Sequence, residues 1–195
     1  MGVVWELHLV LLKKSPLNMK MTIRPFALSL LIALPFVARA EDSVNPVLAP
    51  HAPDLVAVRG AQFAPFNSDQ FLKARYTILY FSAGWCIDCR RFSPSLVSAY
   101  DAQPKGASRF EVLLLTRDKT EKAMLQYMRL TKMKWPALAF DKVASADDLK
   151  RFYSGDGIPC LTVIDRKGAV VLQSKSDQDA TEVLKQLRDL LAANG

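Results

Sequence analysis

The chain has 195 residues, half of them hydrophobic, which is enough for one domain with its own core and excludes a disordered protein. The formal charge is +7, but residues 1–40 hold five lysines or arginines against one glutamate, which leaves the rest at only +3. Such a mixed surface argues against a nucleic-acid partner. Three cysteines are too few for a disulfide framework.

Residues 19–40 have the pattern of an export signal. Lys20 and Arg24 form a positively charged start, and residues 25–37 are an apolar run that is too short to span a bilayer. Residues 38–40 form a small-x-small cleavage site, after which we expect the mature chain to begin. We therefore expect an exported protein, periplasmic or secreted, which would touch a membrane only through an uncleaved signal or a membrane-bound donor.

Two segments flank this signal. We interpret residues 1–18 as an extension or a mis-assigned start. Residues 41–54 contain three prolines and few large apolar side chains, so we expect a flexible linker with a solvated His51. The folded domain is then expected over residues 55–195. Because His51 is the only histidine beyond the signal, that domain has no histidine base, and a Cys–His hydrolase is not expected.

The first half of the domain shows a strand, a turn and a helix in close succession. Residues 55–59 alternate weakly and predict a first strand, and residues 69–74 predict a short helical piece. Residues 76–81 are almost continuously apolar, as expected of a strand buried on both faces. A helical pattern covers residues 86–100, where Pro94 should cause a kink.

The second half continues the alternation of strands and helices. We expect a strand over 110–115, then a helix over 120–131 with Met124, Tyr127 and Met128 in the core. An apolar loop over 135–140 and a brief helix capped by Ser145 should follow. The chain should end with a strand over 161–164, a turn at 165–168, an antiparallel strand over 169–173 and a last helix capped by Ser176. This order predicts an α/β fold, a central sheet with helices on both faces and an insert before residue 161.

Cys86 and Cys89 follow the buried strand and open the helix. A cysteine at a helix start places its sulfur against unpaired backbone N–H groups and the positive end of the helix dipole. That position favours the thiolate, which is the reactive form. Cys89 lies one turn further on and can close a disulfide onto Cys86. The pair therefore predicts a thiol–disulfide oxidoreductase in which Cys86 attacks and the more buried Cys89 resolves the intermediate.

The chain from about residue 55 to residue 191 resembles the thioredoxin fold. A lone Cys-x-x-Cys pair would be weak, since it is also half of a zinc site, but four features together are specific. They are Trp85-Cys86-x-x-Cys89 after a buried strand, Pro94 in the following helix, Ile158-Pro159 before a strand where the family keeps a cis-proline, and a hairpin followed by a C-terminal helix.

Within that family, residues 80–86 and 134–140 look most like the tryparedoxin/nucleoredoxin branch. The stretch of residues 116–161 is too long for the single helix of a minimal thioredoxin and implies an insert. Exported reductases that serve cytochrome c maturation also carry an insert there. Residues 157–159 and 163–165 suit those reductases nearly as well, so both assignments stay open.

The resemblance implies roles for three residues beside the cysteines. Trp85 would cover the site and offer an apolar contact to the partner, although a structural, half-buried tryptophan is an equal alternative. Pro159 in cis would direct the Ile158 backbone toward an extended substrate chain, and a cis bond is otherwise a minority state. Substitution of this proline by alanine should trap mixed disulfides.

Two departures from the family pattern affect the proton chemistry. Tyr80 occupies the position at which thioredoxins bury an aspartate that moves the second cysteine's proton. Proton transfer must then use water, a tyrosine hydroxyl or another carboxylate such as Asp118. Between and after the cysteines, Asp88 disfavours the thiolate, whereas Arg90 and Arg91 favour it, so the sequence leaves the net effect open.

Cys160 is the odd thiol. It is either a small buried residue at a strand start or a third redox-active thiol. Zinc binding by three cysteines lacks a fourth ligand, and no Gly-rich phosphate loop is present, so we expect no metal and no cofactor other than a redox-active Cys86–Cys89 disulfide.

The predicted function is that of a monomeric dithiol reductase or electron carrier, with protein disulfides and an upstream electron donor as partners. The enzymatic alternatives are a disulfide oxidant or isomerase and a cytochrome c maturation reductase. An alternative of another class is a redox-inactive binding module whose cysteine pair is a permanent structural disulfide.

Overall fold

The computed structural model of the protein describes residues 44–104, 109–175 and 179–193. The predicted extension, the export signal and the Ser176 cap lie outside these residues. Within the described ranges, no helix has the length and apolar character needed to cross a bilayer.

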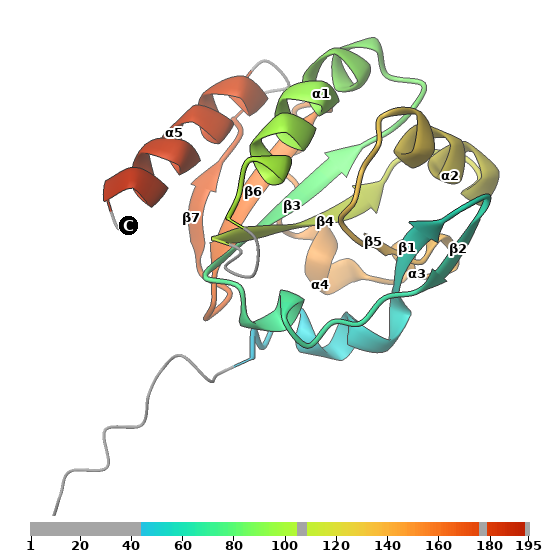
Figure 1. The fold of residues 1–195 in the computed structure, drawn as a ribbon, viewed down its shortest axis with the longest axis horizontal. Coiled ribbons are helices and arrows are strands. Elements are labelled where there is room, and N and C mark those ends of the chain that lie inside the picture. The colour runs from blue at the N-terminus through green and yellow to red at the C-terminus, as the bar shows by residue number, and fades with distance from the viewer. Residues whose placement is uncertain (1–43, 105–108, 176–178, 194–195) are drawn as a thin grey trace, which may run out of the picture. The chain divides into compact units, whose positions relative to one another are not determined.

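One mixed sheet of seven strands forms the centre, in the order β2-β1-β5-β4-β3-β6-β7 (Figure 1). The strands are β1 (Leu55–Arg59), β2 (Gln62–Pro65), β3 (Tyr76–Ser82), β4 (Phe110–Thr116), β5 (Ala137–Leu138), β6 (Cys160–Asp165) and β7 (Val170–Gln173). β3 runs parallel to β4 and antiparallel to β6. Every residue of β3 and β4 is buried, which explains why their sequences are mostly apolar rather than alternating.

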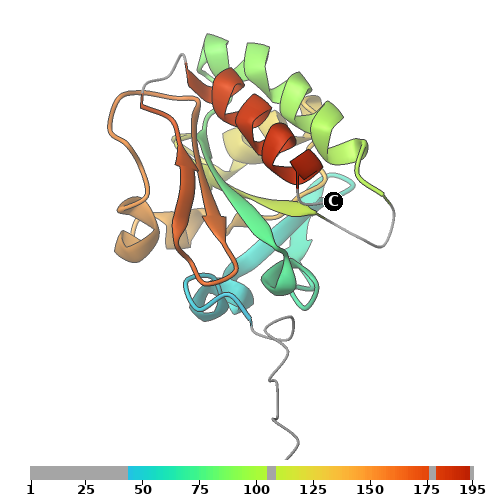
Figure 2. The same cartoon turned by 90° about the vertical axis from the view of Figure 1, so that its left-hand side faces the viewer.

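Helices cover both faces of the sheet, as predicted. They are η2 (Ala49–Asp54), η3 (Phe71–Lys73), α1 (Ile87–Asp101), α2 (Glu121–Leu130), α3 (Phe140–Val143), α4 (Asp147–Lys150) and α5 (Ala180–Ala193). Apolar side chains of α1, α2 and α5 share one core with Ile78 and Tyr80, whereas η2, η3 and α4 pack on the other face with Leu79 and Phe81. Figure 2 shows α1 and α5 side by side over the sheet.

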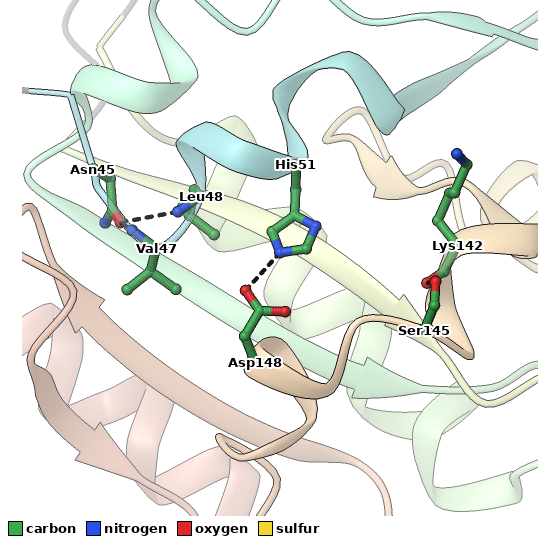
Figure 3. Close-up of polar contacts among 7 residues, drawn as sticks. All are labelled: Asn45, Val47, Leu48, His51, Lys142, Ser145 and Asp148. Carbon is green, nitrogen blue, oxygen red and sulfur yellow. Dashed lines mark hydrogen bonds and ion pairs between the residues drawn. The ribbon is translucent and has the colours of Figure 1, made fainter.

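The predicted linker is the first correction. Residues 44–54 are not flexible but packed against the domain, which therefore begins near Asn45 rather than at residue 55. The Asn45 side chain accepts the Leu48 N–H at 3.2 Å, and Leu48 is fully buried. His51, predicted to be solvated, lies 2.8 Å from the Asp148 carboxylate of α4 (Figure 3). The His51–Asp148 contact joins residues 97 positions apart in the chain, so local composition gave no sign of it.

Three smaller predictions also fail. β2 was missed because it is a half-exposed edge strand. Within residues 135–140, predicted to be a loop, Ala137–Leu138 form β5, which pairs with β1 and β4 inside the sheet, and two residues are too few to show a strand period. Ser145 does not cap the brief helix, because its hydroxyl donates to the Lys142 carbonyl at 3.1 Å and Ala146 is the N-cap of α4 (Figure 3).

Candidate active site

Cys86 lies at the N-terminus of α1, where the predicted strand–turn–helix places it. It is the N-cap residue of the helix, and its sulfur accepts the Cys89 backbone N–H at 3.1 Å. On the other side, its thiol donates to the Ile158 carbonyl at 3.3 Å. The sulfur therefore replaces the oxygen of an ordinary N-cap side chain and sits at the positive end of the helix dipole.

Cys89 lies one turn into the helix and is fully buried, whereas Cys86 keeps 8% of its surface exposed. Both thiols are free. Burial, together with the hydrogen bond to the Cys86 thiol, raises the pKa of Cys89 to about 12, although Ser82 and the Ala83 backbone act in the opposite direction. Cys89 therefore keeps its proton at neutral pH, and Cys86 is the sulfur that a partner can reach.

A surface groove of about 640 Å³ leads to the Cys86 sulfur. Its walls come from the active-site turn, the end of β4 and the segment before β6, namely Trp85, Ile87, Asp88, Arg117, Tyr153, Gly157 and Ile158. Trp85 is 60% exposed, and its ring nitrogen donates to the Arg117 carbonyl at 3.0 Å. Because Trp85 is fixed at one end yet open to solvent, its position favours a contact with a partner over a structural role in the core.

The opposite wall is the segment before β6. The Ile158–Pro159 peptide bond is cis, as the resemblance predicted, and Pro159 itself is buried. The Ile158 carbonyl faces the Cys86 sulfur. Tyr153, from the predicted insert, accepts the Gly157 N–H at 3.1 Å and stacks under the Arg117 guanidinium at 5.0 Å. Sequence reasoning missed Tyr153 and Arg117, which carry no motif of their own.

The charged residues around the cysteines are engaged with neighbours. Asp88 pairs with Arg91 at 3.1 Å, and both side chains are well exposed. Arg90 donates to the Gly84 carbonyl at 2.6 Å. Exposed ion pairs of this kind contribute little energy. The influence of these three charges on the Cys86 sulfur stays a prediction.

The Tyr80 hydroxyl is one of four buried hydroxyl groups that form a hydrogen-bonded cluster behind Cys89. This hydroxyl lies 3.0 Å from that of Ser93 and 3.2 Å from that of Tyr127. Tyr127 also bonds Ser82 at 2.7 Å and Ser93 at 2.6 Å. Sequence reasoning named Tyr80 but assigned Tyr127 only to the core. The residue spacings that could have revealed this cluster were missed. Ser82 lies two residues after Tyr80 on the same face of the strand, and Ser93 lies one helical turn after Cys89.

Asp118, the alternative proton acceptor, holds the active-site turn instead. Its oxygens accept the Gly84 N–H at 2.9 Å and the Thr116 hydroxyl at 3.0 Å. Burial raises the pKa of this carboxyl. Both oxygens are thus occupied by the residues that shape the turn, and the geometry does not place Asp118 on Cys89.

Cys160 lies on the other face of the sheet. It is fully buried, pairs with Phe81 in the β3–β6 register and lies 3.3 Å from the Ser154 hydroxyl. This environment fits the interpretation of a small core residue. Throughout the described ranges, no three histidine, cysteine, aspartate or glutamate side chains gather in a way that could hold a metal ion.

Comparison with known proteins agrees with this geometry. Residues 74–170 match a family described as thioredoxin-like. The tryparedoxin of Trypanosoma brucei brucei is 36% identical over 101 residues, which cover 51% of this chain and 68% of that protein. The chain belongs to the thioredoxin-like family. The predicted likeness to the tryparedoxin/nucleoredoxin branch is confirmed.

Other members of the family match over different lengths. Nucleoredoxin of Xenopus laevis is 34% identical over 116 residues, which are 60% of this chain but only 27% of that protein, so the chain spans about a quarter of this relative. A solved tryparedoxin from Trypanosoma brucei superposes with a TM-score of 0.55 at 28% identity, covering 71% of this chain and 91% of the other. Tryparedoxin I from Crithidia fasciculata gives 0.54 at 27% identity, with the same coverage. These superpositions confirm the predicted thioredoxin-like fold.

Proposed function

We propose that this chain exchanges electrons with protein disulfides through Cys86 and Cys89, as a dithiol reductase or electron carrier in an exported compartment. The observation that carries the proposal is the Cys86 sulfur, which caps α1 at the end of an open groove and contacts the Ile158 carbonyl at 3.3 Å. An upstream donor would return the pair to the dithiol state.

The geometry supports a two-step exchange. The Cys86 thiolate attacks one sulfur of the partner disulfide, forms a mixed disulfide and releases the other partner sulfur as a thiolate. Cys89 then loses its proton and attacks the Cys86 sulfur, which closes the Cys86–Cys89 disulfide and releases the second partner sulfur. Two electrons pass from the protein to the partner, whose two sulfurs end as thiols. Extended partner backbone would lie along Ile158 while Trp85 provides an apolar contact.

An insulin-reduction assay tests this activity. The wild-type protein should turn over, Cys86→Ser should not, and Cys160→Ser serves as the matched control with unchanged turnover. A redox-inactive binding module, the alternative of another class, would give no turnover with any of these proteins, and that result would overturn the proposal.

The direction of electron flow needs the redox potential. Known Cys-x-x-Cys couples span about −270 to −120 mV. A reductase or electron carrier is expected near the negative end when the protein is equilibrated with glutathione. A value near the positive end would assign it to the oxidants or isomerases.

The exported location rests on the signal pattern of residues 19–40, and the monomeric state is part of the proposal. Cleavage after Ala40 would leave every described contact in place, since the first of them begins at Asn45, whose N–H donates to the Leu72 carbonyl at 3.0 Å. Expression of the full chain in a bacterial host should give a periplasmic monomer that starts at Glu41 by mass spectrometry. An intact Met1, or a dimer in light scattering, would contradict these points.

A further inference from the structure

The four hydroxyl groups behind Cys89 form a closed hydrogen-bond network. Tyr80 and Ser82 come from one face of β3, Ser93 from α1 and Tyr127 from α2, so three elements meet at this point. Tyr80 and Ser82 are wholly buried, as is Ser93, and Tyr127 is nearly so. A hydroxyl donates one proton and accepts up to two, and buried networks of this kind are stable only when nearly every group is satisfied.

Counting donors shows that two protons in the network can change partners, that of Ser82 and that of Tyr80, whose hydroxyl lies 3.0 Å from Ser93 and 3.2 Å from Tyr127. The Ser93 hydroxyl donates its proton to the Cys89 carbonyl at 2.7 Å. The short 2.6 Å contact is then a bond that Tyr127 donates to Ser93. The Tyr127 oxygen can accept from either Tyr80 at 3.2 Å or Ser82 at 2.7 Å. The Ser82 proton can therefore turn away from Tyr127 without leaving that oxygen unsatisfied.

We propose that Ser82, supported by Tyr127 and Tyr80, is the reversible hydrogen-bond partner of the Cys89 sulfur in the resolving step. When Cys89 is a thiol, its S–H donates to the Ser82 oxygen and the Ser82 proton points to Tyr127. When Cys89 is a thiolate, the Ser82 proton turns to the sulfur and Tyr80 donates to Tyr127. The inference deepens the proposed function and rests on it. It assigns Ser82 to the reacting sulfur and makes Tyr127 and Tyr80 positioning residues.

The mixed disulfide is the state in which this switch matters. In the free dithiol, the Cys86 thiol is one of the groups that raise the pKa of Cys89, next after burial. Once Cys86 is bound to the partner it can no longer do so. Burial is then opposed by Ser82 and by the Ala83 backbone, the two groups that lower the pKa of this thiol. The network would thus favour ionisation of Cys89 when the thiolate is needed.

The step balances without a buried carboxylate. Cys89 gives its proton through solvent to the departing partner thiolate, the Cys86–partner bond breaks and the Cys86–Cys89 bond forms. The titratable groups that face Cys89 are Cys86 on α1, Tyr80 on β3 and Tyr127 on α2, and burial raises the pKa of both phenols. These phenols therefore stay neutral and serve as donors and acceptors, not as bases.

A two-phase reaction with Ellman's reagent tests the proposal. Attack by Cys86 releases one equivalent of thionitrobenzoate, and attack by Cys89 on the resulting mixed disulfide releases a second. We expect Ser82→Ala to slow the second phase by about threefold to tenfold and Tyr127→Phe to slow it less, while the first phase is unchanged. Loss of a hydrogen bond to a charged group shifts a pKa by one unit or more, and the gain in nucleophilicity offsets part of the lost thiolate.

The pH profile separates this role from a structural one. In Ser82→Ala, the curve of second-phase rate against pH should move to higher pH by about one unit. The matched control is Tyr100→Phe. Tyr100 lies on α1, the helix that carries Ser93, and its hydroxyl donates to Glu111 of β4 at 2.7 Å, so its loss should leave both phases unchanged.

The outcomes are distinguishable. Unchanged second phases in both Ser82→Ala and Tyr127→Phe, or an equal slowing in Tyr100→Phe, overturn the role of the network and leave the proposed function intact. A wild-type protein that releases only one equivalent overturns both.

Discussion

The two faces of the sheet each bury one thiol completely, yet they give it different surroundings. Cys89 lies on the face covered by α1 and α2, one helical turn from Cys86 and beside the hydroxyl network. Cys160 lies on the face closed by η2 and α4, opposite Phe81 and among apolar side chains. Burial alone therefore does not decide which thiol does redox chemistry. A second sulfur within reach decides it, because Cys160 also has a hydroxyl group beside it, that of Ser154 at 3.3 Å.

The largest expected difference between the two thiols is in turnover. Cys89→Ser should lower insulin reduction by at least about a hundredfold, because the mixed disulfide on Cys86 then has no resolving thiol, and a trapped one-to-one adduct should appear by mass spectrometry. Cys160→Ser should change turnover by less than about twofold. A comparable loss in both variants would mean that Cys160 takes part in the exchange.

Thiol counting sharpens the same contrast. In Cys86→Ser/Cys89→Ser protein, the one remaining thiol is Cys160, which is fully buried. It should fail to react with Ellman's reagent in the native state and should react fully in denaturant. Rapid native reaction would support the interpretation of a third redox-active thiol.

The pH dependence of stability should depend on the redox state. The folded-state pKa of Cys89 is raised to about 12 from the ordinary 9.0. The stability linked to its protonated form is therefore complete below pH 9 and is lost as the pH rises toward 12. The reduced protein should lose up to a few kcal/mol over this range by denaturant unfolding. The oxidised protein, in which Cys89 cannot ionise, should lose less, because only the buried phenols whose pKa is raised, such as Tyr80 and Tyr127, then contribute. Parallel curves for the two forms would contradict this assignment.

Gly84→Ala should disturb the Cys89 face alone. An added Cβ would lie 2.9 Å from the Cβ of Tyr127, so the turn or α2 must shift, at a cost of about 1–3 kcal/mol in unfolding free energy. The second phase with Ellman's reagent should slow as Tyr127 moves. Gly155→Ala is the control, since its Cβ meets nothing within 4 Å and only its positive φ is strained. Unaltered kinetics in Gly84→Ala would show that Tyr127 tolerates the shift.

The smallest effect is expected from the His51–Asp148 contact, which joins η2 and α4 on the Cys160 face of the sheet. Burial disfavours the charged form of Asp148, but the hydrogen bond and charge of His51, together with backbone N–H groups at the start of α4, more than offset this and lower its pKa. The contribution of the pair is therefore present above the ordinary value of 3.8 and is lost as the pH falls below it. Because the Asp148 side chain is about half exposed, His51→Gln should lower the unfolding free energy by only about 0.2–1 kcal/mol. Turnover should not change, and a fall in turnover would connect this face to the active site.

Local signals allowed much of the redox face to be predicted. The Cys86 cap, the buried strand before it and the Ile158–Pro159 segment each follow from residues within a few positions of one another. The same reasoning failed for residues 44–54 and for β5. Asn45 bonds the Asp165 carbonyl across 120 residues, and Ala137 pairs with Val56 and Leu114. Composition and periodicity do not report contacts of this range.

The sequence by itself determined the chemistry of this protein: two cysteines at the start of a helix, the order of strands and helices, and the family that this pattern resembles. Only the tertiary structure decided what surrounds the second cysteine, since Ser82 and Tyr127 are 45 residues apart and meet because β3 and α2 pack on the same face. The reason is physical. Capping and periodicity act over one or two turns of chain, whereas a buried proton partner is set by side chains that only packing brings together.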